Sequence, residues 1–127
     1  NKKKKEAIYP ITLLNLGVLY NDRPNYDYDK AESYLKKSIE ALESDKSAVE
    51  IEKNDSKNYD YSSHYINLGG CYLNRGNLDK AEQFVLKGLR LLENRYRKNK
   101  AVFDAGHVFY DSWVILGMIY QAKKQYE

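Results

Sequence analysis

A segment of twelve residues occurs three times in this chain, and the three copies align without gaps. The copies are YPITLLNLGVLY at residues 9–20, YSSHYINLGGCY at 61–72 and FYDSWVILGMIY at 109–120. Each copy begins with an aromatic residue, has a bulky residue fifth and an aliphatic residue sixth, continues with a Leu-Gly pair and ends with tyrosine. Such self-similarity is the sequence signature of a repeat protein. The chain is therefore expected to be built from equivalent units.

The spacing within each copy is that of an α-helix. The bulky residue precedes the leucine by three positions, and the glycine precedes the tyrosine by three, so that these residues share one helical face. Glycine inside a helix costs about 1 kcal/mol relative to alanine. Its recurrence at Gly17, Gly69 and Gly117 is explained if a second helix crosses there too closely for a side chain to fit.

A second amphipathic helix is predicted after each of the first two copies. The tetrapeptide Asp-Lys-Ala-Glu occurs at 29–32 and again at 79–82, and it opens both helices. Asp29 and Asp79 are expected to act as N-caps. The inward-facing residues recur at helical spacing and include small ones where the partner helix comes close: Ala31, Leu35, Ser38 and Leu42, then Ala81, Val85, Gly88 and Leu92.

The predicted turns between paired helices differ in length. Gly76 and Asn77 form the turn of the second unit, because both residue types favour turn conformations. Residues 21–25 do this in the first unit with two extra residues.

These motifs together resemble the tetratricopeptide repeat. The second unit carries the pattern most fully, the first has a lengthened turn, and the third stops at Glu127, where its second helix is expected to begin. The repeat signature consists of Leu16, Gly17, Tyr20, Ala31, Leu68, Gly69, Tyr72, Ala81, Trp113, Leu116, Gly117 and Tyr120. Residues 12–20 are also similar locally to the long-helix repeats of kinesin light chains.

The resemblance implies an all-α fold, a right-handed superhelical stack of antiparallel helix pairs. The expected divisions are a basic N-terminal tail at 1–8, unit 1 at 9–60, unit 2 at 61–108, and the first helix with the start of the turn of a truncated unit 3 at 109–127.

The repeat length departs from the family pattern. The glycines recur after 52 and 48 residues, whereas tetratricopeptide units have about 34. The additional residues lie at 43–60 and 94–108, where they form either extended helices or loops. We favour extended helices, continued by Val49, Ile51, Tyr96 and Val102 and interrupted by a polar loop at 53–58.

The resemblance also implies where a partner binds, namely in the concave groove lined by the first helix of each unit. The candidate residues there are Asn15, Asn67, Leu14, Val18, Ile66 and Ile115. Peptide-binding relatives use an asparagine at the position of Asn15 and Asn67 to pair with an extended backbone, which a carboxamide can do as donor and acceptor. Solvation, or a bridge between adjacent helices, is the alternative role for both.

The groove is predicted to suit a hydrophobic peptide or helix. Chaperone-binding relatives hold a terminal carboxylate with a clamp of Lys, Arg and Asn, but Leu14, Val18, Asp111 and Ile115 occupy the corresponding positions here. Aliphatic side chains cannot bind an anion, and an aspartate repels one.

No catalytic, cofactor or metal site is predicted. His64 and His107 have no acid or thiol at ligand spacing. Cys71, the only cysteine, is expected to be a small buried residue. Trp113 lies in the bulky column and is expected in the core. The net charge of +3 provides no general attraction to nucleic acid, and the chain has no apolar stretch approaching the roughly 18 residues of a membrane span.

The sequence therefore predicts a non-catalytic, intracellular (cytoplasmic) protein-interaction scaffold within a larger protein or assembly. A peptide-sensing segment of a bacterial transcriptional regulator or signalling protein is the alternative. RNA binding by a related helical repeat is a third hypothesis, disfavoured by the apolar residues Leu14, Ile66 and Val114. A homo-dimer through the uncapped third unit is a further expectation, because its apolar surface needs a cover.

Overall fold

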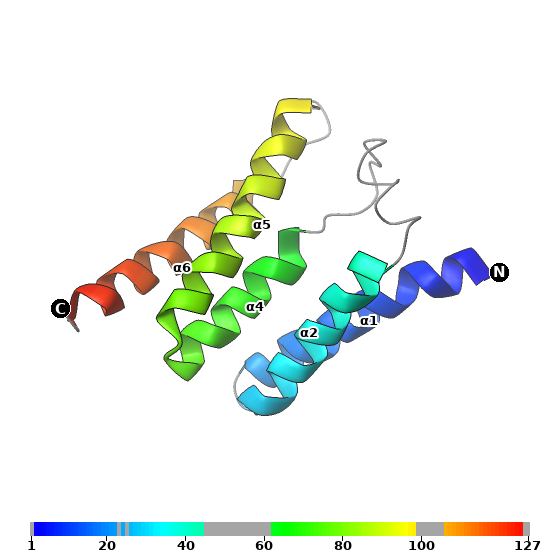
Figure 1. The fold of residues 1–127 in the computed structure, drawn as a ribbon, viewed down its shortest axis with the longest axis horizontal. Helices are drawn as coiled ribbons and strands as arrows, with labels where there is room; N and C mark the ends of the chain where they lie inside the picture. Colours follow the sequence, from blue (N-terminus) through cyan, green and yellow to red (C-terminus); the bar gives the residue numbers. More distant parts are fainter. Residues whose placement is uncertain (1, 23, 25, 45–61, 99–105, 126–127) are drawn as a thin grey trace. The chain divides into compact units, whose positions relative to one another are not determined.

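The computed structural model describes residues 2–22, 24, 26–44, 62–98 and 106–125, in which every regular element is an α-helix (Figure 1). The helices are α1 (Lys2–Asn21), α2 (Tyr28–Ser44), α4 (Ser62–Arg75), α5 (Leu78–Lys98) and α6 (Gly106–Gln125). The prediction of an all-α fold is therefore confirmed. The chain divides into two compact units, Asn1–Tyr59 and Asp60–Glu127, which we describe in turn.

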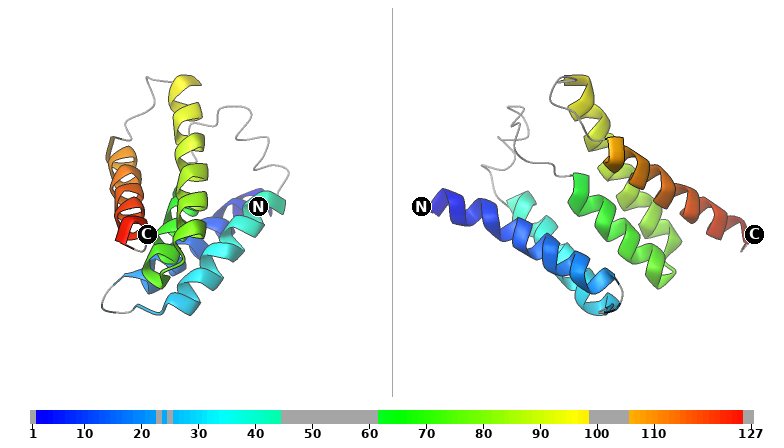
Figure 2. Two further views of the ribbon diagram at one scale, coloured as in Figure 1. Left: turned by 60° about the vertical axis from the view of Figure 1, so that its left-hand side comes forward. Right: turned by 180° about the vertical axis from the view of Figure 1, so that it is seen from behind.

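The first unit is a helical hairpin in which α2 returns along α1 (Figure 2). Leu13 of α1 is buried against a stripe on α2 that follows helical spacing. The buried residues of α2 are Ala31, Leu35, Ser38, Ile39 and Leu42, which confirms the predicted inward face. The polar Ser38 is accommodated because its hydroxyl donates a hydrogen bond to the carbonyl of Leu35 at 2.7 Å.

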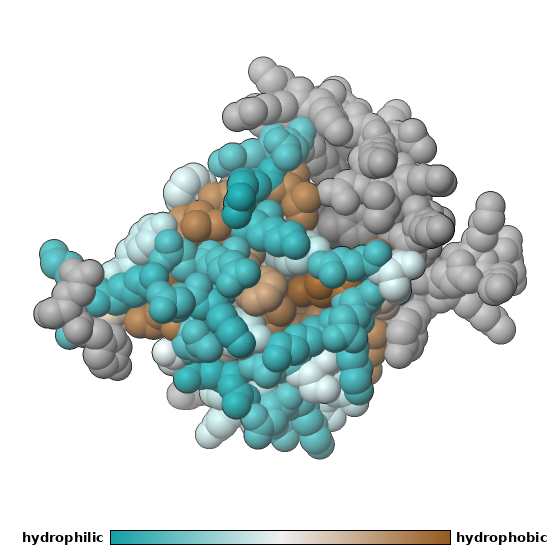
Figure 3. Space-filling model, viewed as in Figure 1, coloured by the Kyte–Doolittle hydropathy of each residue, from teal (hydrophilic) through white to brown (hydrophobic). Residues whose placement is uncertain are grey.

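The second unit contains a hairpin of α4 and α5, with α6 packed mainly on α5 and to a smaller extent on α4. Its core is apolar and comes from all three helices. The buried hydrophobic residues are Tyr65, Ile66, Leu68, Cys71, Tyr72, Ala81, Val85, Leu89, Leu92, Leu116 and Ile119. The opposite faces of α2 and α5 are rich in Lys and Glu, and hydrophilic residues dominate the side of the molecule shown in Figure 3.

Glycine lets the two helices of each hairpin approach one another. A Cβ atom built on Gly17 would lie 2.5 Å from Cγ of Leu35, and one on Gly69 would lie 3.0 Å from the carbonyl oxygen of Ala81. Carbon atoms are normally 3.5–4.0 Å apart at optimal contact, so neither position has room for a side chain. The predicted close crossing is confirmed at both glycines.

Gly117 departs from this expectation, because a Cβ atom there would meet nothing within 4 Å. Among the described residues of the second unit, 62–98 and 106–125, the helices that pack on α6 are α5 and α4, which lie on one side of it (Figure 2, right). The prediction of a close crossing is therefore wrong for Gly117 in this structure.

The turn of the second unit is a Schellman motif. The N–H of Gly76 donates to the carbonyl of Leu73 at 3.0 Å, and the N–H of Asn77 donates to that of Tyr72 at 2.9 Å. Gly76 has φ of 81°, a left-handed conformation that glycine adopts without steric cost. The predicted turn is thereby confirmed.

The longer turn of the first unit retains one hydrogen bond of that motif. The N–H of Asp27 donates to the carbonyl of Tyr20 at 2.6 Å, and Tyr20 corresponds to Tyr72. The two additional residues of the first unit therefore lie between Tyr20 and Asp27, the equivalents of Tyr72 and Asn77.

The N-caps differ from those predicted. Oδ1 of Asp27 accepts a hydrogen bond from the N–H of Lys30 at 3.1 Å, and Oδ1 of Asn77 accepts one from that of Lys80 at 3.3 Å. Asp29 and Asp79 lie within the first turn of their helices, where a negative charge still interacts favourably with the helix dipole. The assignment of Asp29 and Asp79 as caps is therefore wrong by two residues.

The start of α1 differs from the prediction, whereas the end of α5 agrees with it. Helix α1 begins at Lys2, so residues 2–8 belong to a helix where the sequence suggested a basic tail. Helix α5 continues to Lys98, as expected for an extended second helix. The predicted extension at 45–60, with the loop at 53–58, and Val102 lie outside the described residues.

Gly69→Ala is expected to destabilise the second unit. The new methyl group would overlap Val85 and the backbone of α5, and such overpacking costs about 1–3 kcal/mol, more than the gain of about 1 kcal/mol in helix propensity. Gly117→Ala is the matched control, and it is expected to be neutral or stabilising because its surroundings are open. Urea unfolding of both variants measures the difference. Equal effects would contradict the close crossing.

Asp27→Ala is expected to lower the free energy of unfolding by about 1 kcal/mol, because the N–H of Lys30 would lose its cap. Asp29→Ala leaves this cap in place and removes a charge from the first turn of α2, so it is expected to cost less than Asp27→Ala. Thermal unfolding monitored by circular dichroism compares the two. A larger loss for Asp29→Ala would show that the cap has been misassigned.

Candidate partner-binding surface

The α1 surface, defined here as Leu14, Asn15 and Val18, is the part of the predicted groove that the first unit presents. Asn15 is exposed, and Leu14 and Val18 are half-buried. Successive helical residues are rotated by about 100°, so Asn15 lies opposite the stripe of Leu13, Gly17 and Tyr20 that faces α2. Leu14 and Val18 lie to one side, between Asn15 and that stripe. The surface thus combines an accessible carboxamide with apolar contact area.

Asn67, the counterpart of Asn15 in α4, uses its amide group within its own helix. Nδ2 of Asn67 donates to the carbonyl oxygen of Ser63 at 2.7 Å, and the side chain is part-buried. A bond to a carbonyl fixes which end of the amide is the nitrogen. Oδ1 of Asn67 is therefore directed away from Ser63 as an acceptor.

The other two candidates in the second unit have different environments. Ile66 is buried, and its Cγ1 lies 2.6 Å from the place of a Cβ atom built on Gly88 of α5. It therefore contributes to the packing of the hairpin. Ile115 of α6 is half-buried.

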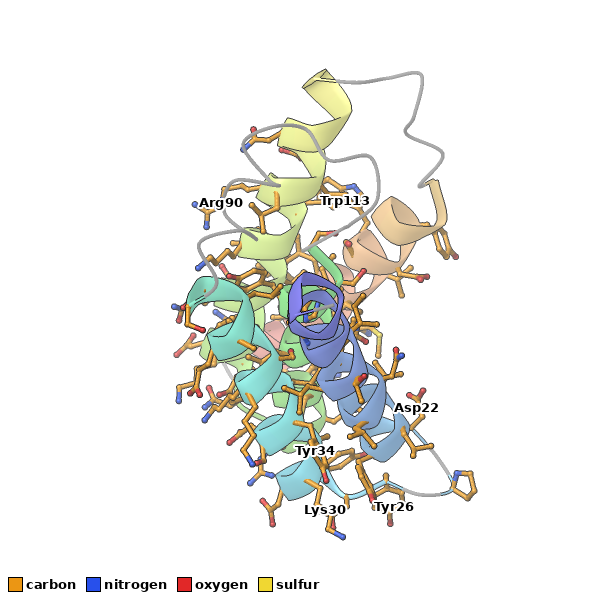
Figure 4. All side chains as sticks on the ribbon, turned by 90° about the vertical axis from the view of Figure 1, so that its right-hand side faces the viewer. Asp22, Tyr26, Lys30, Tyr34, Arg90 and Trp113 are labelled. Atoms are coloured by element: carbon orange, nitrogen blue, oxygen red, sulfur yellow. The ribbon has the colours of Figure 1, made fainter. Side chains whose placement is uncertain are left out.

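Trp113 is 56% exposed, so its assignment to the core is wrong for this structure. The corresponding residues Leu13 and Tyr65 are buried, because the second helix of each hairpin lies over them. Figure 4 shows Trp113 on α6. Tyr120, which shares the column of Tyr20 and Tyr72, is 47% exposed.

An aromatic stack with a lysine above it recurs beside the turn of each hairpin, and it is not among the features predicted from the sequence. The rings of Tyr20 and Tyr34 are 5.8 Å apart between centroids and inclined by 8°. Nζ of Lys30 lies 5.2 Å from the centroid of Tyr20, within the range of a cation–π interaction. Lys30 and Tyr34 are seen near the turn end of α2 in Figure 4.

The second hairpin repeats this arrangement. Tyr72 stacks on Phe84 at 5.6 Å and 17°, and Nζ of Lys80 lies 5.4 Å from the centroid of Tyr72. The signal was available in the sequence, because Lys, Ala, an aromatic residue and Leu or Val follow one another at the same offsets in both second helices.

Ion pairs join the last turn of α6 to the N-terminal end of α5. Nζ of Lys123 lies 2.6 Å from Oε2 of Glu82 and 2.9 Å from Oδ1 of Asp79. The hydrogen bond to Glu82, followed by that to Asp79, raises the pKa of Lys123 above its usual value. Lys123 therefore remains charged at physiological pH and helps to orient α6.

The described residues contain no group of three His, Cys, Asp or Glu side chains arranged to bind a metal ion. His64 and Cys71 are fully buried in α4; His107 lies in α6. Within the described part of the chain, no helix combines the length and apolar character needed to cross a membrane.

Helical hairpins that are closed by a short turn and held at a glycine contact define a helical-repeat protein. Residues 64–94, which contain most of α4 and α5, match the family model described as tetratricopeptide repeat. The chain therefore contains a tetratricopeptide repeat, as the sequence motifs predicted, and it falls in the general class of protein-interaction scaffolds. No curated protein and no solved structure matched the chain.

Trp113 is the only tryptophan in the chain, so its fluorescence tests its exposure. We expect emission typical of an indole in water and efficient quenching by acrylamide, because 56% of the residue is exposed. Unfolding in guanidinium chloride should change the emission maximum little. A blue-shifted maximum that resists quenching in the native protein would contradict the exposed position.

Proposed function

We propose that this chain is a non-catalytic scaffold that binds an apolar peptide or helix of a partner protein on its first helices. The observation that carries the proposal is the α1 surface, where the exposed Asn15 is flanked by the half-buried Leu14 and Val18. Apolar side chains supply contact area, and the carboxamide can pair with one N–H and one C=O of a bound backbone.

The chemistry of these positions favours a neutral ligand over an acidic one. In the first unit, Leu14 and Val18 carry no charge. In the second unit, considered by itself, Ile115 is uncharged and the exposed Asp111 on α6 disfavours a carboxylate. In the second unit, Ile115 adds apolar area and Asn67 offers its Oδ1 atom as an acceptor. Binding to a partner, and not a reaction, is the activity that these residues support.

The setting we propose is intracellular. Cys71 is the only cysteine of the sequence and is buried, so no internal disulfide stabilises the chain. Such chains are common in reducing compartments.

Asn15→Arg tests the α1 surface. Peptides selected from a random library on the wild-type chain are expected to bind the variant at least about tenfold more weakly, a change of about 1.4 kcal/mol. Because Asn15 is exposed, the fold should be retained. Glu40→Arg introduces the same side chain at an exposed position of α2 and should bind like the wild type. Equal affinities for all three proteins, measured by fluorescence anisotropy, would refute the α1 surface as the binding site.

A further inference from the structure

The part of the predicted groove that lies in the second unit is formed by α4 and α6, which pack on each other and run in the same direction (Figure 1). At the repeat offset of 48 residues, Asn67 of α4 corresponds to Ile115 of α6. Asp111 and Met118 lie four positions before and three positions after Ile115, so all three share one face of α6. We call Asn67, Asp111, Ile115 and Met118 the α4–α6 surface.

The α4–α6 surface is accessible and partly apolar. Met118 is 52% exposed, Asp111 is exposed, and Ile115 and Asn67 are half-buried. Met118 is the only methionine of the sequence, and its unbranched thioether side chain adapts its shape to that of a neighbour. Ile115 and Met118 therefore provide apolar contact area directly beside two polar side chains.

The polar groups of this surface are hydrogen-bond acceptors. Nδ2 of Asn67 donates to the carbonyl oxygen of Ser63 at 2.7 Å, so the Oδ1 atom of Asn67 is the one that a ligand can meet. Asp111 adds a carboxylate, which in its ionised form only accepts hydrogen bonds. A ligand that matches both groups must therefore supply donors.

The negative charge of Asp111 is not paired with a side chain in the described part of the structure. Asp111 takes part in none of the ion pairs there, whereas the acidic residues at the start of α5 share Lys123. The cationic residues of α4 and α6 are at the C-terminal ends of these helices: Arg75, Lys123 and Lys124. Lys123 lies about 18 Å from Asp111 along the axis of α6, more than twice the Debye length of about 8 Å. The carboxylate is therefore accessible to an incoming cation.

The spacing along α6 determines the pattern of a matching segment. Asp111 and Ile115 are separated by about 6 Å along the helix axis, at a rise of about 1.5 Å per residue. In an extended peptide, residues two positions apart point to the same side and are separated by about 6.6 Å. A cationic residue opposite Asp111 would therefore place the residue two positions away opposite Ile115.

We propose that the α4–α6 surface selects an extended partner segment in which a lysine or arginine is two positions from a large apolar residue. The cation pairs with Asp111, the apolar residue contacts Ile115 and Met118, and an N–H of the segment donates to Oδ1 of Asn67. This inference rests on the proposed function, because it specifies the chemistry of the peptide that the first helices bind.

Peptide selection on the full chain gives the first test. Peptides recovered from a random library are expected to be enriched in Lys or Arg two positions from Leu, Ile, Phe or Met. Replacing the basic residue of a selected peptide by Gln is expected to weaken binding about threefold, as is typical for the loss of an exposed ion pair. Fluorescence anisotropy measures the affinities, and the difference between the two peptides should shrink at high salt.

Asp111→Lys is the decisive variant of the chain. Because Asp111 is exposed, the fold should be retained, and a selected peptide whose basic residue is replaced by Glu should now bind more tightly than the original. Asp111→Asn should bind the original peptide and its Gln version equally. Glu40→Lys makes the same charge change at an exposed position of α2 and should keep the preference of the wild type.

Two results would overturn this inference while leaving the proposed function in place. One is a set of selected peptides that are sensitive to Asn15→Arg but lack the basic residue. The other is an Asp111→Lys variant that still prefers the basic peptide over its Glu version. Failure to select any peptide on the wild-type chain would overturn both proposals.

Discussion

The contact between a glycine on one helix and the backbone of its neighbour determines how each hairpin is assembled. At Gly69 the carbonyl of Ala81 would lie 3.0 Å from a Cβ atom, so the two helix axes come closer than side chains would otherwise allow. This approach brings Val85 into van der Waals contact along the α4 backbone. It also fixes the helices in one register, because only a residue without a side chain can occupy the crossing point. The reciprocal contact of Gly88 with Ile66 sets a second point along the same pair.

The aromatic stacks follow from that register. Three residues beyond each glycine, Tyr20 and Tyr72 meet the aromatic residues of the second helices, with centroid separations of 5.8 and 5.6 Å. The agreement is notable because the turns differ by two residues, so turn length cannot be its cause. Packing along the helices sets the relative position of the rings, and the lysines Lys30 and Lys80 add a cation to the same face.

Much of the fold was predictable because periodic patterns report local geometry. The Leu-Gly pair with tyrosine three residues later specified the helical face, and the inward stripes of α2 and α5 followed from helical spacing. The sequence predicts the N-caps two residues too late, since aspartates such as Asp29 and Asp79 are as typical of a first turn as of a cap. The sequence predicts a buried Trp113 because the equivalent Leu13 and Tyr65 are buried, but burial depends on a neighbouring helix and not on the position within the motif. The role of Asn67 is not predictable for a different reason. Its hydrogen bond to Ser63 depends on the side-chain rotamer, which the sequence does not specify.

The unequal turns show where the repeat tolerates change in length. In the first unit, the main-chain bond from Asp27 to Tyr20 closes a larger ring than its equivalent from Asn77 to Tyr72, yet both second helices start correctly capped. The same two positions are thus joined by a hydrogen bond across connections of different length, and loop-closure entropy rises only slowly with length. Peptide epitopes or fluorophore-bearing segments inserted after Asn21 would consequently leave the phase of α2 intact, which makes this turn a natural grafting point in an otherwise length-constrained architecture.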